Sequence, residues 1–231
     1  LYGEDAIDGS GNGLDNYLQG NDAANTLNGM AGGDILEGMA GDDSYVVDSA
    51  DDLVLCLISG GASALLPYPS EPITLSEKQA TTKLLLACGA TINELNCVRK
   101  HLSALKGGQL AHLAHPARVK TLILSDVIGD PLDTIGSGPT VPDSSTFADA
   151  WEIIYKHGLE AKLQAAVRRH LKQGVNHAIP ETPKPGDPIF RRTTNTLIGS
   201  NRLSLRAAQK TARELGYRVS EPADKVYHYR E

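Results

Sequence analysis

The first 52 residues contain no lysine, arginine or histidine, although the chain of 231 residues has 22 Lys and Arg and 7 His. Twelve of its 28 acidic residues lie in that segment, which therefore carries −12, while the rest carries +6 of the total of −6. This asymmetry indicates two different modules. The acidic module has few apolar side chains to offset the ordering of its backbone, so it should need a cation to fold.

Further absences exclude classes of protein. No apolar run approaches the roughly 18 residues of a membrane-spanning helix, and no basic segment with an apolar run opens the chain as in a signal peptide. Aromatic residues are 5% of the chain and are not clustered with basic ones, so nucleic acid is not an expected partner. Neither GxGxxG nor GxxxxGK followed by Ser or Thr occurs, which leaves a Rossmann dinucleotide site and a P-loop unsupported.

Cysteine is also scarce. Cys56, Cys88 and Cys97 are odd in number and lie in apolar or helical contexts. Buried free thiols in a reducing compartment are therefore favoured over disulfides, and we expect a soluble, cytoplasmic protein for the basic part of the chain. A zinc site at His112 and His115 is a minor alternative to two surface histidines.

The acidic segment is built from repeats of nine residues. From residue 11 it reads GNGLDNYLQ, GNDAANTLN, GMAGGDILE and GMAGDDSYV. Position six is occupied in turn by Asn16, Asn25, Asp34 and Asp43. The pattern, over about residues 9–50, resembles the calcium-binding nonapeptide repeat of RTX proteins, which forms a parallel β-roll around Ca²⁺.

The RTX resemblance implies calcium binding, because glycines permit tight turns and carboxylates supply the hard oxygen ligands that Ca²⁺ prefers. Met30 and Met39 replace the second glycine of their repeats. We therefore expect one or two weak calcium sites that use Asp34 and Asp43, with Asn16 and Asn25 two turns away. RTX repeats usually function outside the cell, in conflict with the free thiols. A flexible linker rich in Gly and Asp is the alternative reading.

Residues 96–111, NCVRKHLSALKGGQLA, join a basic helix to a Lys-Gly-Gly turn. Arg99 and Lys106 supply cations, while Gly107 and Gly108 supply backbone N–H groups that no side chain hinders. A helix expected to start near Gln109 would aim its positive end at the same place. Helix, cations and flexible backbone together predict a phosphate site.

Two other blocks accompany this one: LISGGASALL at 57–66 and SDVIGDPLDTIGSGPTVPD at 125–143. Together the three resemble the glycerate 2-kinase family, some of whose members have been labelled hydroxypyruvate reductases, from about residue 55 to residue 219. The resemblance implies ATP-dependent phosphorylation of glycerate at its 2-hydroxyl, with ATP and Mg²⁺. Reduction of hydroxypyruvate is the weaker alternative, because no dinucleotide fingerprint is present.

Strands and helices alternate after the repeats. Apolar runs predict buried strands at 53–58, 119–124 and 196–199 and the start of a fourth at 217–219. Helices are expected at 76–88, opened by a capping box from Ser76 to Gln79, and at 93–104, 146–157, 160–172 and 201–215. The order predicts an α/β fold, a parallel Rossmann-like sheet with helices on both faces, preceded by a short calcium-binding β-roll.

Ligands of such sheets gather beyond the carboxyl ends of the strands. Gly60, Gly61 and Ser63 follow the first strand there, and Ser125 and Asp126 follow the second. Each has a structural explanation alone, since glycines turn a strand into a helix and Ser or Asp caps one. Their coincidence favours a functional site.

Phosphoryl transfer requires N–H groups and cations around the phosphates, carboxylates for Mg²⁺ and a positioned acceptor hydroxyl. We assign Asp126 and Asp130 to Mg²⁺ or proton handling, and Lys106 with Arg99 to phosphate charge. The structural alternative for Asp126 is a helix cap, and the alternative for Asp130 is an ordinary Asp-Pro turn. The other binding candidates are Asn96, for the glycerate hydroxyls, and Gly107, Gly108, Ser137 and Gly138 in the glycine turns.

The expected domains are calcium-binding repeats at 1–52, a partial glycerate kinase α/β domain at 53–219 and a polar tail at 220–231. The family normally has a strand and helix with a catalytic lysine before the Ser-Gly-Gly loop at 59–61, and a second domain after the last helix. Neither is expected here, which predicts a fusion with low or no kinase activity, because both walls of the cleft align the substrates. A calcium-binding β-roll carrying a silent α/β remnant is the main alternative, and the oligomeric state stays open.

Overall fold

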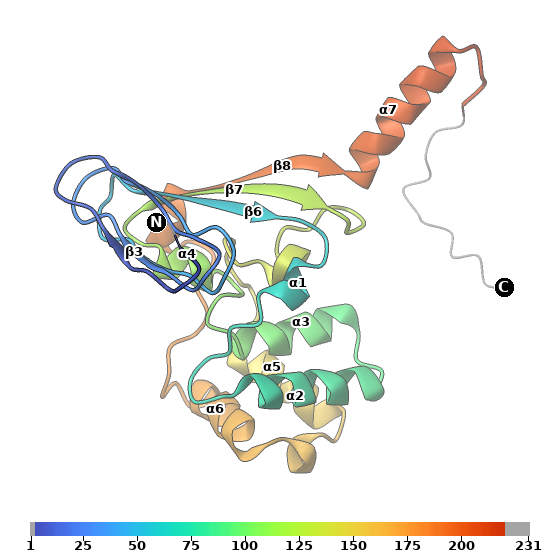
Figure 1. Ribbon diagram of the computed structural model, residues 1–231. Coiled ribbons are helices and arrows are strands. Elements are labelled where there is room, and N and C mark those ends of the chain that lie inside the picture. Colours follow the sequence, from blue (N-terminus) through green and yellow to red (C-terminus); the bar gives the residue numbers. More distant parts are fainter. Residues whose placement is uncertain (1–2, 220–231) are drawn as a thin grey trace.

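The computed structural model describes residues 3–219 and contains a central parallel sheet with helices packed against it (Figure 1). Its strands are β6 (Leu53–Ile58), β7 (Arg118–Ser125) and β8 (Thr193–Ser200), in the order β6-β7-β8. Both neighbouring pairs run parallel. The predicted α/β fold with a parallel sheet flanked by helices is therefore confirmed.

The helices that connect these strands lie on one side of the sheet, which Figure 1 shows below it. Spatial order follows chain order, and right-handed crossovers then place both connections on the same face. Ile58 and Ile123 face these helices and are buried, whereas Leu57 and Leu124 point the other way and are 74% and 51% exposed. In the described residues the expectation of helices on both faces is wrong.

A helical lobe is formed by α2 (Leu75–Ala87), α3 (Ile92–His101), α5 (Phe147–Lys156) and α6 (Ala165–Val175). Its core contains buried side chains from each helix, among them Leu85, Val98, Phe147, Ile154 and Leu171. Short elements complete this side of the molecule: α1 (Ala62–Leu65), α4 (Gln109–Leu113) and the 3₁₀ turns η1 (Ile135–Ser137), η2 (Glu160–Lys162) and η3 (Pro188–Arg192).

Three helices of the lobe begin with the same capping box. In α2 the Thr74 hydroxyl accepts from the Glu77 N–H, and the Glu77 carboxylate accepts from the Thr74 N–H at 2.9 Å. Thr91 and Thr146 open α3 and α5 in the same way. The predicted box from Ser76 to Gln79 is therefore displaced by two residues, because Glu77 offers a charged acceptor at the positive end of the helix.

Two other predicted elements differ. The helix expected at 160–172 is divided into η2 and α6 by Leu163, which is extended and inserts its side chain into the core. Residues 217–219, expected to begin a fourth strand, are irregular because the preceding helix carries the chain away from the sheet. The predicted polar tail at 220–231 lies outside the described residues.

The acidic segment is a coil of short parallel strands. One sheet contains β1 (Gly9–Ser10), β3 (Thr26–Asn28) and β5 (Ser44–Val46), and the other contains β2 (Tyr17–Gln19) and β4 (Ile35–Glu37). Partner strands are two nonapeptides apart, as in the pairing of Leu18 with Leu36 and of Leu27 with Tyr45. Leu27 is completely buried between the turns. The repeats therefore set the strand spacing of this segment.

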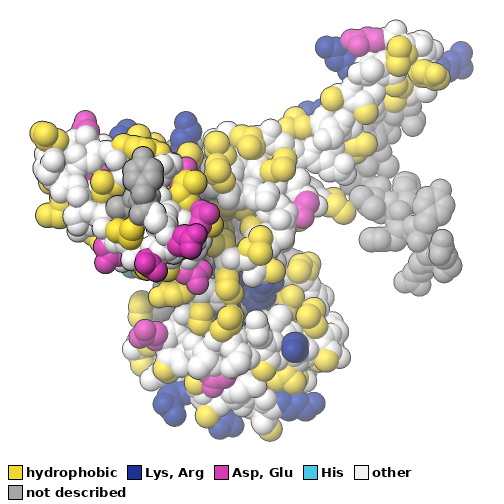
Figure 2. Space-filling view, in the orientation of Figure 1, with side chains coloured by type: hydrophobic (Ala, Val, Ile, Leu, Met, Phe, Trp, Pro, Cys, Tyr) yellow, Lys and Arg dark blue, Asp and Glu magenta, His cyan; other side chains and the backbone are white. Residues whose placement is uncertain are grey.

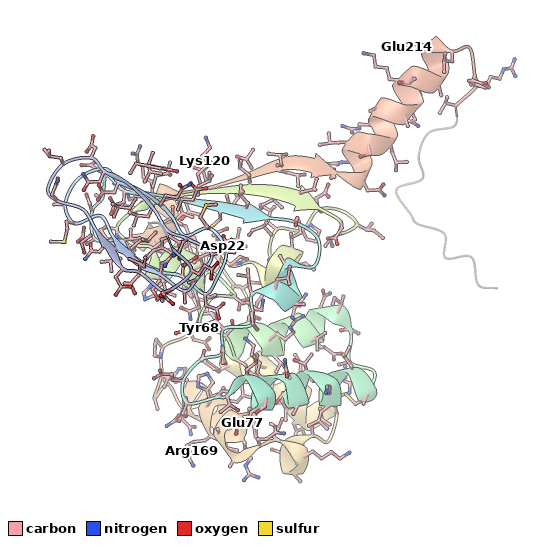
Figure 3. All side chains as sticks on the ribbon, viewed as in Figure 1. Asp22, Tyr68, Glu77, Lys120, Arg169 and Glu214 are labelled. Carbon is pink, nitrogen blue, oxygen red and sulfur yellow. The ribbon has the colours of Figure 1, made fainter. Side chains whose placement is uncertain are left out.

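The last helix, α7 (Asn201–Glu214), has no buried residue and extends away from the sheet (Figures 1 and 3). Figure 3 places Glu214 at its far end, well away from Glu77 and Arg169 of the helical lobe. Hydrophobic side chains lie along it and over the sheet (Figure 2), with Leu203 and Leu205 both more than 40% exposed. Within residues 3–219 no helix is long and apolar enough to cross a membrane.

Candidate active site

The glycine loop after β6 lies against the turn that follows β7. A Cβ atom on Gly60 would stand 2.5 Å from Oδ2 of Asp126, so the glycine loop and the Asp126 side chain approach each other closely. Gly61 has φ 81° and starts α1 in the left-handed region. The structure thus brings together Gly60 and Asp126, two predicted site residues that are far apart in the chain.

A pocket of about 740 Å³ opens beyond the carboxyl ends of β7 and β8. Its lining includes Gly60, Ser125, Asp126, Gly199 and Asn201. The amino end of α7 points into the same region, and its N–H groups and helix dipole favour an anion there. The predicted Ser125 shapes the wall, since its hydroxyl accepts from the Val127 N–H at 3.2 Å.

A second group of predicted residues meets on the helical side of the glycine loop. The Ser63 and Ser137 hydroxyls are 2.6 Å apart, and Ser137 donates to Oδ1 of Asn96 at 3.2 Å. Ser137 is buried and has φ 63°, between two glycines in the same left-handed region. Three segments of the chain therefore join through these side chains, on the helical side of the glycine loop after β6.

The Lys-Gly-Gly turn braces this junction. The Gly107 N–H donates to the Ser137 carbonyl at 3.0 Å, and the Gly108 N–H donates to the Gly138 carbonyl at 2.8 Å. Lys106 is fully buried, and its ammonium donates to the Ser63 carbonyl at 2.9 Å and the Gly136 carbonyl at 3.5 Å. These donors, predicted to contact phosphate directly, instead fix the two loops to each other in this structure.

Two further cations approach the same segment. The Arg99 guanidinium, which is half-buried, donates to the Ser63 carbonyl at 2.6 Å. The Lys78 ammonium is buried and donates to the carbonyls of Pro67 at 3.0 Å and Tyr68 at 3.3 Å. The sequence analysis missed Lys78, because no motif surrounds it. The Thr74 capping box is the signal that would have placed it in the first turn of α2.

Desolvation is the main cause that lowers the pKa of both buried lysines. It brings the pKa of Lys78 to about 7, with smaller contributions from Lys106 and Arg99. For Lys106 the pKa falls to about 8, where Arg99 adds to the effect of burial. The pKa of Lys78 therefore lies near physiological pH, and that of Lys106 lies somewhat above it.

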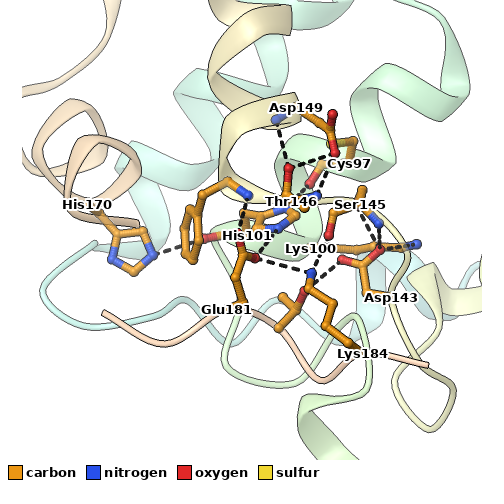
Figure 4. A network of polar contacts seen from close by, with 12 residues as sticks. Cys97, Lys100, His101, Asp143, Ser145, Thr146, Asp149, His170, Glu181 and Lys184 are labelled. Carbon is orange, nitrogen blue, oxygen red and sulfur yellow. Dashed lines mark hydrogen bonds and ion pairs between the residues drawn. The ribbon is translucent and has the colours of Figure 1, made fainter. Parts of the chain in front are cut away.

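The neighbouring residues of α3 point into a separate polar network (Figure 4). Lys100 pairs with Asp143 at 3.2 Å, and His101 faces Glu181 at 3.3 Å. Burial raises the pKa of Asp143, but Lys100 and the hydrogen bonds from Ser145 outweigh it and leave that pKa lowered. The network fastens α3 to the loop before β8, so only Arg99 of the three consecutive basic residues reaches the candidate site.

The two predicted carboxylates occupy different positions. Asp126 is exposed at the pocket, whereas Asp130 has φ 55°, a 10% exposed side chain and Arg202 at 3.9 Å. Among residues 3–219 no group of three or more His, Cys, Asp or Glu side chains is arranged to hold a metal. Asp126 alone, or with Asp130, suits Mg²⁺, which protein sites often hold through one or two carboxylates, water and substrate phosphates.

The chain has close relatives of known name. A family model described as "Domain of unknown function (DUF4147)" matches residues 43–172. The chain is 52% identical over 169 residues to glycerate kinase from Rattus norvegicus, covering 73% of the chain and 31% of the relative. It is 44% identical over 169 residues to glycerate 2-kinase from Pyrococcus horikoshii, covering 73% and 38%. The chain thus spans about a third of the length of these curated relatives.

A solved structure is similar over a longer range. The crystal structure of glycerate kinase from Thermotoga maritima matches with a TM-score of 0.65 and 32% identity, covering 89% of this chain and 55% of that one. The family model begins at residue 43, so most of the acidic coil lies outside it, and calcium binding there stays a prediction.

Proposed function

The chain belongs to the glycerate kinase (DUF4147) family, and on that premise we propose that its site takes part in ATP-dependent phosphorylation of glycerate at the 2-hydroxyl. One observation carries the proposal. The glycine loop after β6, the Asp126 turn after β7 and the start of α7 surround one pocket at the carboxyl ends of the strands. A parallel sheet places ligand sites at this edge.

Different pocket residues suit different steps of phosphoryl transfer. Bound ATP would supply the phosphoryl group, and Mg²⁺ would offset its negative charge. The N–H groups at the start of α7 and the open backbone of Gly60 suit phosphate oxygens. Asp126 is exposed beside them, and we assign it to Mg²⁺ or to the proton of the attacking hydroxyl.

Calorimetry with ATP and Mg²⁺, together with an assay of ADP release on addition of glycerate, tests this function. Asp126→Asn should bind ATP nearly as well as the parent protein and lose about 10²-fold or more of its glycerate-dependent ADP release. Glu152→Gln makes the same chemical change at an exposed position on α5 and should leave both readouts unchanged. Absence of both nucleotide binding at millimolar ATP and glycerate-dependent ADP release would refute the proposal.

A second candidate function is calcium binding by the acidic coil. Oδ2 of Asp34 is buried and has no hydrogen-bond partner, while Oδ1 accepts from the Asn16 N–H at 2.8 Å. An uncompensated carboxylate oxygen beside glycine-rich turns suits Ca²⁺, with backbone carbonyls as the other ligands. Asp43 repeats only the Oδ1 contact, since it accepts from the Asn25 N–H at 2.9 Å and is partly buried.

Circular dichroism with millimolar Ca²⁺ or Mg²⁺ separates calcium binding from a general charge effect. Ca²⁺ alone should increase the order of the coil, because Mg²⁺ requires tighter octahedral geometry and retains its water. Asp34→Ala combined with Asp43→Ala should abolish the response. An equal response to both ions, or none, would contradict calcium binding.

A further inference from the structure

Among residues 3–219, three lysines are buried on the helical side of the molecule, and within those residues only one of them is paired with a carboxylate. Lys100 has Asp143 at 3.2 Å and Asp133 at 3.9 Å. Lys78 and Lys106 are 5% and 0% exposed, and within residues 3–219 neither has a carboxylate within 4.0 Å. The hydrogen bonds of their ammonium groups within these described residues go to main-chain carbonyls.

These two lysines and Arg99 converge on one short segment, 63–68, that follows the glycine loop. Lys78 reaches it from α2, Arg99 from α3 and Lys106 from the turn after α3. Figure 3 shows Tyr68, at the end of this segment, between the sheet and the helical lobe. A carbonyl dipole compensates a buried cation only in part, so a negative charge beside these three groups would stabilise their charged forms.

The charged groups around Lys78 are all of its own sign. Lys106 and Arg99 act on it from the other elements, and both disfavour its ammonium form. Glu77, its neighbour on α2, is turned away to the helix start, where it binds Thr74. No neighbouring carboxylate therefore supplies the compensation within the described part of the chain.

We propose that Lys78, Arg99 and Lys106 form a subsite for an anionic group of a small ligand, a carboxylate or a phosphate, whose charge completes the cluster. Arg99 is the half-buried member and would contact the anion, while the buried lysines strengthen the positive potential behind it. Ser63, whose carbonyl binds both Arg99 and Lys106, links the cluster to Ser137 and Asn96. The inference rests on the proposed function and assigns charge recognition to this group.

The subsite predicts that binding is accompanied by proton uptake. The pKa of Lys78 lies near 7 and that of Lys106 near 8 without ligand, so both are partly or largely neutral at pH 8.5. An anion raises both values, and protons are then taken up from the solution. At pH 6 the two lysines are already charged, so uptake should be close to zero and binding tighter.

Calorimetry of the full chain in buffers of different ionisation enthalpy measures this uptake. The probes are glycerate, inorganic phosphate and glycerol, which carries no charge. Uptake at pH 8.5 with glycerate identifies a carboxylate as the ligand group, and uptake with phosphate identifies a phosphate. Either result supports the subsite, whereas binding of neither anion, or binding of glycerol as tight as that of glycerate, overturns it.

Substitutions connect the effect to the named residues. Lys78→Met should weaken binding of the anion by about tenfold and reduce the proton uptake by roughly half, because Lys106 still titrates, whereas Lys78→Arg should keep the affinity. Lys83→Met, at an exposed position of the same helix, should change neither. Unchanged affinity and uptake in a folded Lys78→Met protein would overturn the proposal. If the parent protein binds the anion with proton uptake but shows neither ATP binding nor glycerate-dependent ADP release, only the kinase function is refuted.

Discussion

The face of the sheet that carries Ile58 and Ile123 is covered by helices, whereas the face that carries Leu57 and Leu124 is open in the described residues. Both faces carry large apolar side chains, so the presence of apolar residues alone does not distinguish them. The connections between the strands distinguish the two faces, because right-handed crossovers between strands arranged in chain order place all the connecting helices on one side. The comparison shows that an apolar strand predicts what can be buried, while topology decides what is buried.

The largest effect is expected on the covered side, at the Lys100–Asp143 pair. The Asp143 side chain is completely buried and also accepts from Ser145 and Thr182. Asp143→Ala should reduce the free energy of unfolding by about 3–5 kcal/mol, because it leaves Lys100 as a buried charge without its partner. Urea denaturation measures the change, and a loss below about 1 kcal/mol would contradict this account of the pair.

The same pair makes the stability of the folded protein depend on pH. The pKa of Asp143 is lowered in the folded state, so its stabilisation is complete above the unfolded value of about 4 and is lost as pH falls through the folded value. Asp143→Asn should therefore lose less stability than the parent protein on acidification from pH 5 to pH 3. If the two proteins lose the same stability on acidification, Asp143 is not a source of the pH dependence.

Adjacent residues of β6 offer a direct test of the two faces. Ile58→Ala should destabilise the protein by about 2–5 kcal/mol, because it opens a cavity in the covered face. Leu57→Ala, on the open face, should change the free energy of unfolding by less than about 0.5 kcal/mol. Similar losses would show that the open face is buried in solution.

The smallest effect concerns helix starts. Thr146 caps α5 inside the lobe, and Ser200 caps α7 outside it, where its hydroxyl accepts from the Leu203 N–H at 3.3 Å. Thr146→Ala should lower global stability by about 1 kcal/mol, whereas Ser200→Ala should only speed amide exchange within α7. A global loss with Ser200→Ala would mean that α7 is coupled to the core.

Local chemistry was predictable to a useful extent. The apolar run at 53–58 became β6, and the Lys-Gly-Gly turn lies beside Ser137, another residue that the sequence analysis assigned to the site. The roles of Lys106 and Lys78 were not predictable, because burial and hydrogen bonding to distant carbonyls depend on how the segments meet in space. A motif shows which groups are present, but not whether their donors face a ligand or the protein.

The parallel strand order also has a consequence for how quickly the molecule forms. Neighbouring strands of the sheet are far apart in the chain. β6 ends at Ile58 and β7 begins at Arg118, while β8 begins only at Thr193, so each pair forms only after a long crossover has been made. Contacts between segments so distant in sequence form slowly, whereas α2 and α3 are adjacent in the chain and can pair early. The lobe should therefore assemble before the sheet, and the pocket, which needs β8 and the start of α7, should be among the last parts to appear during synthesis.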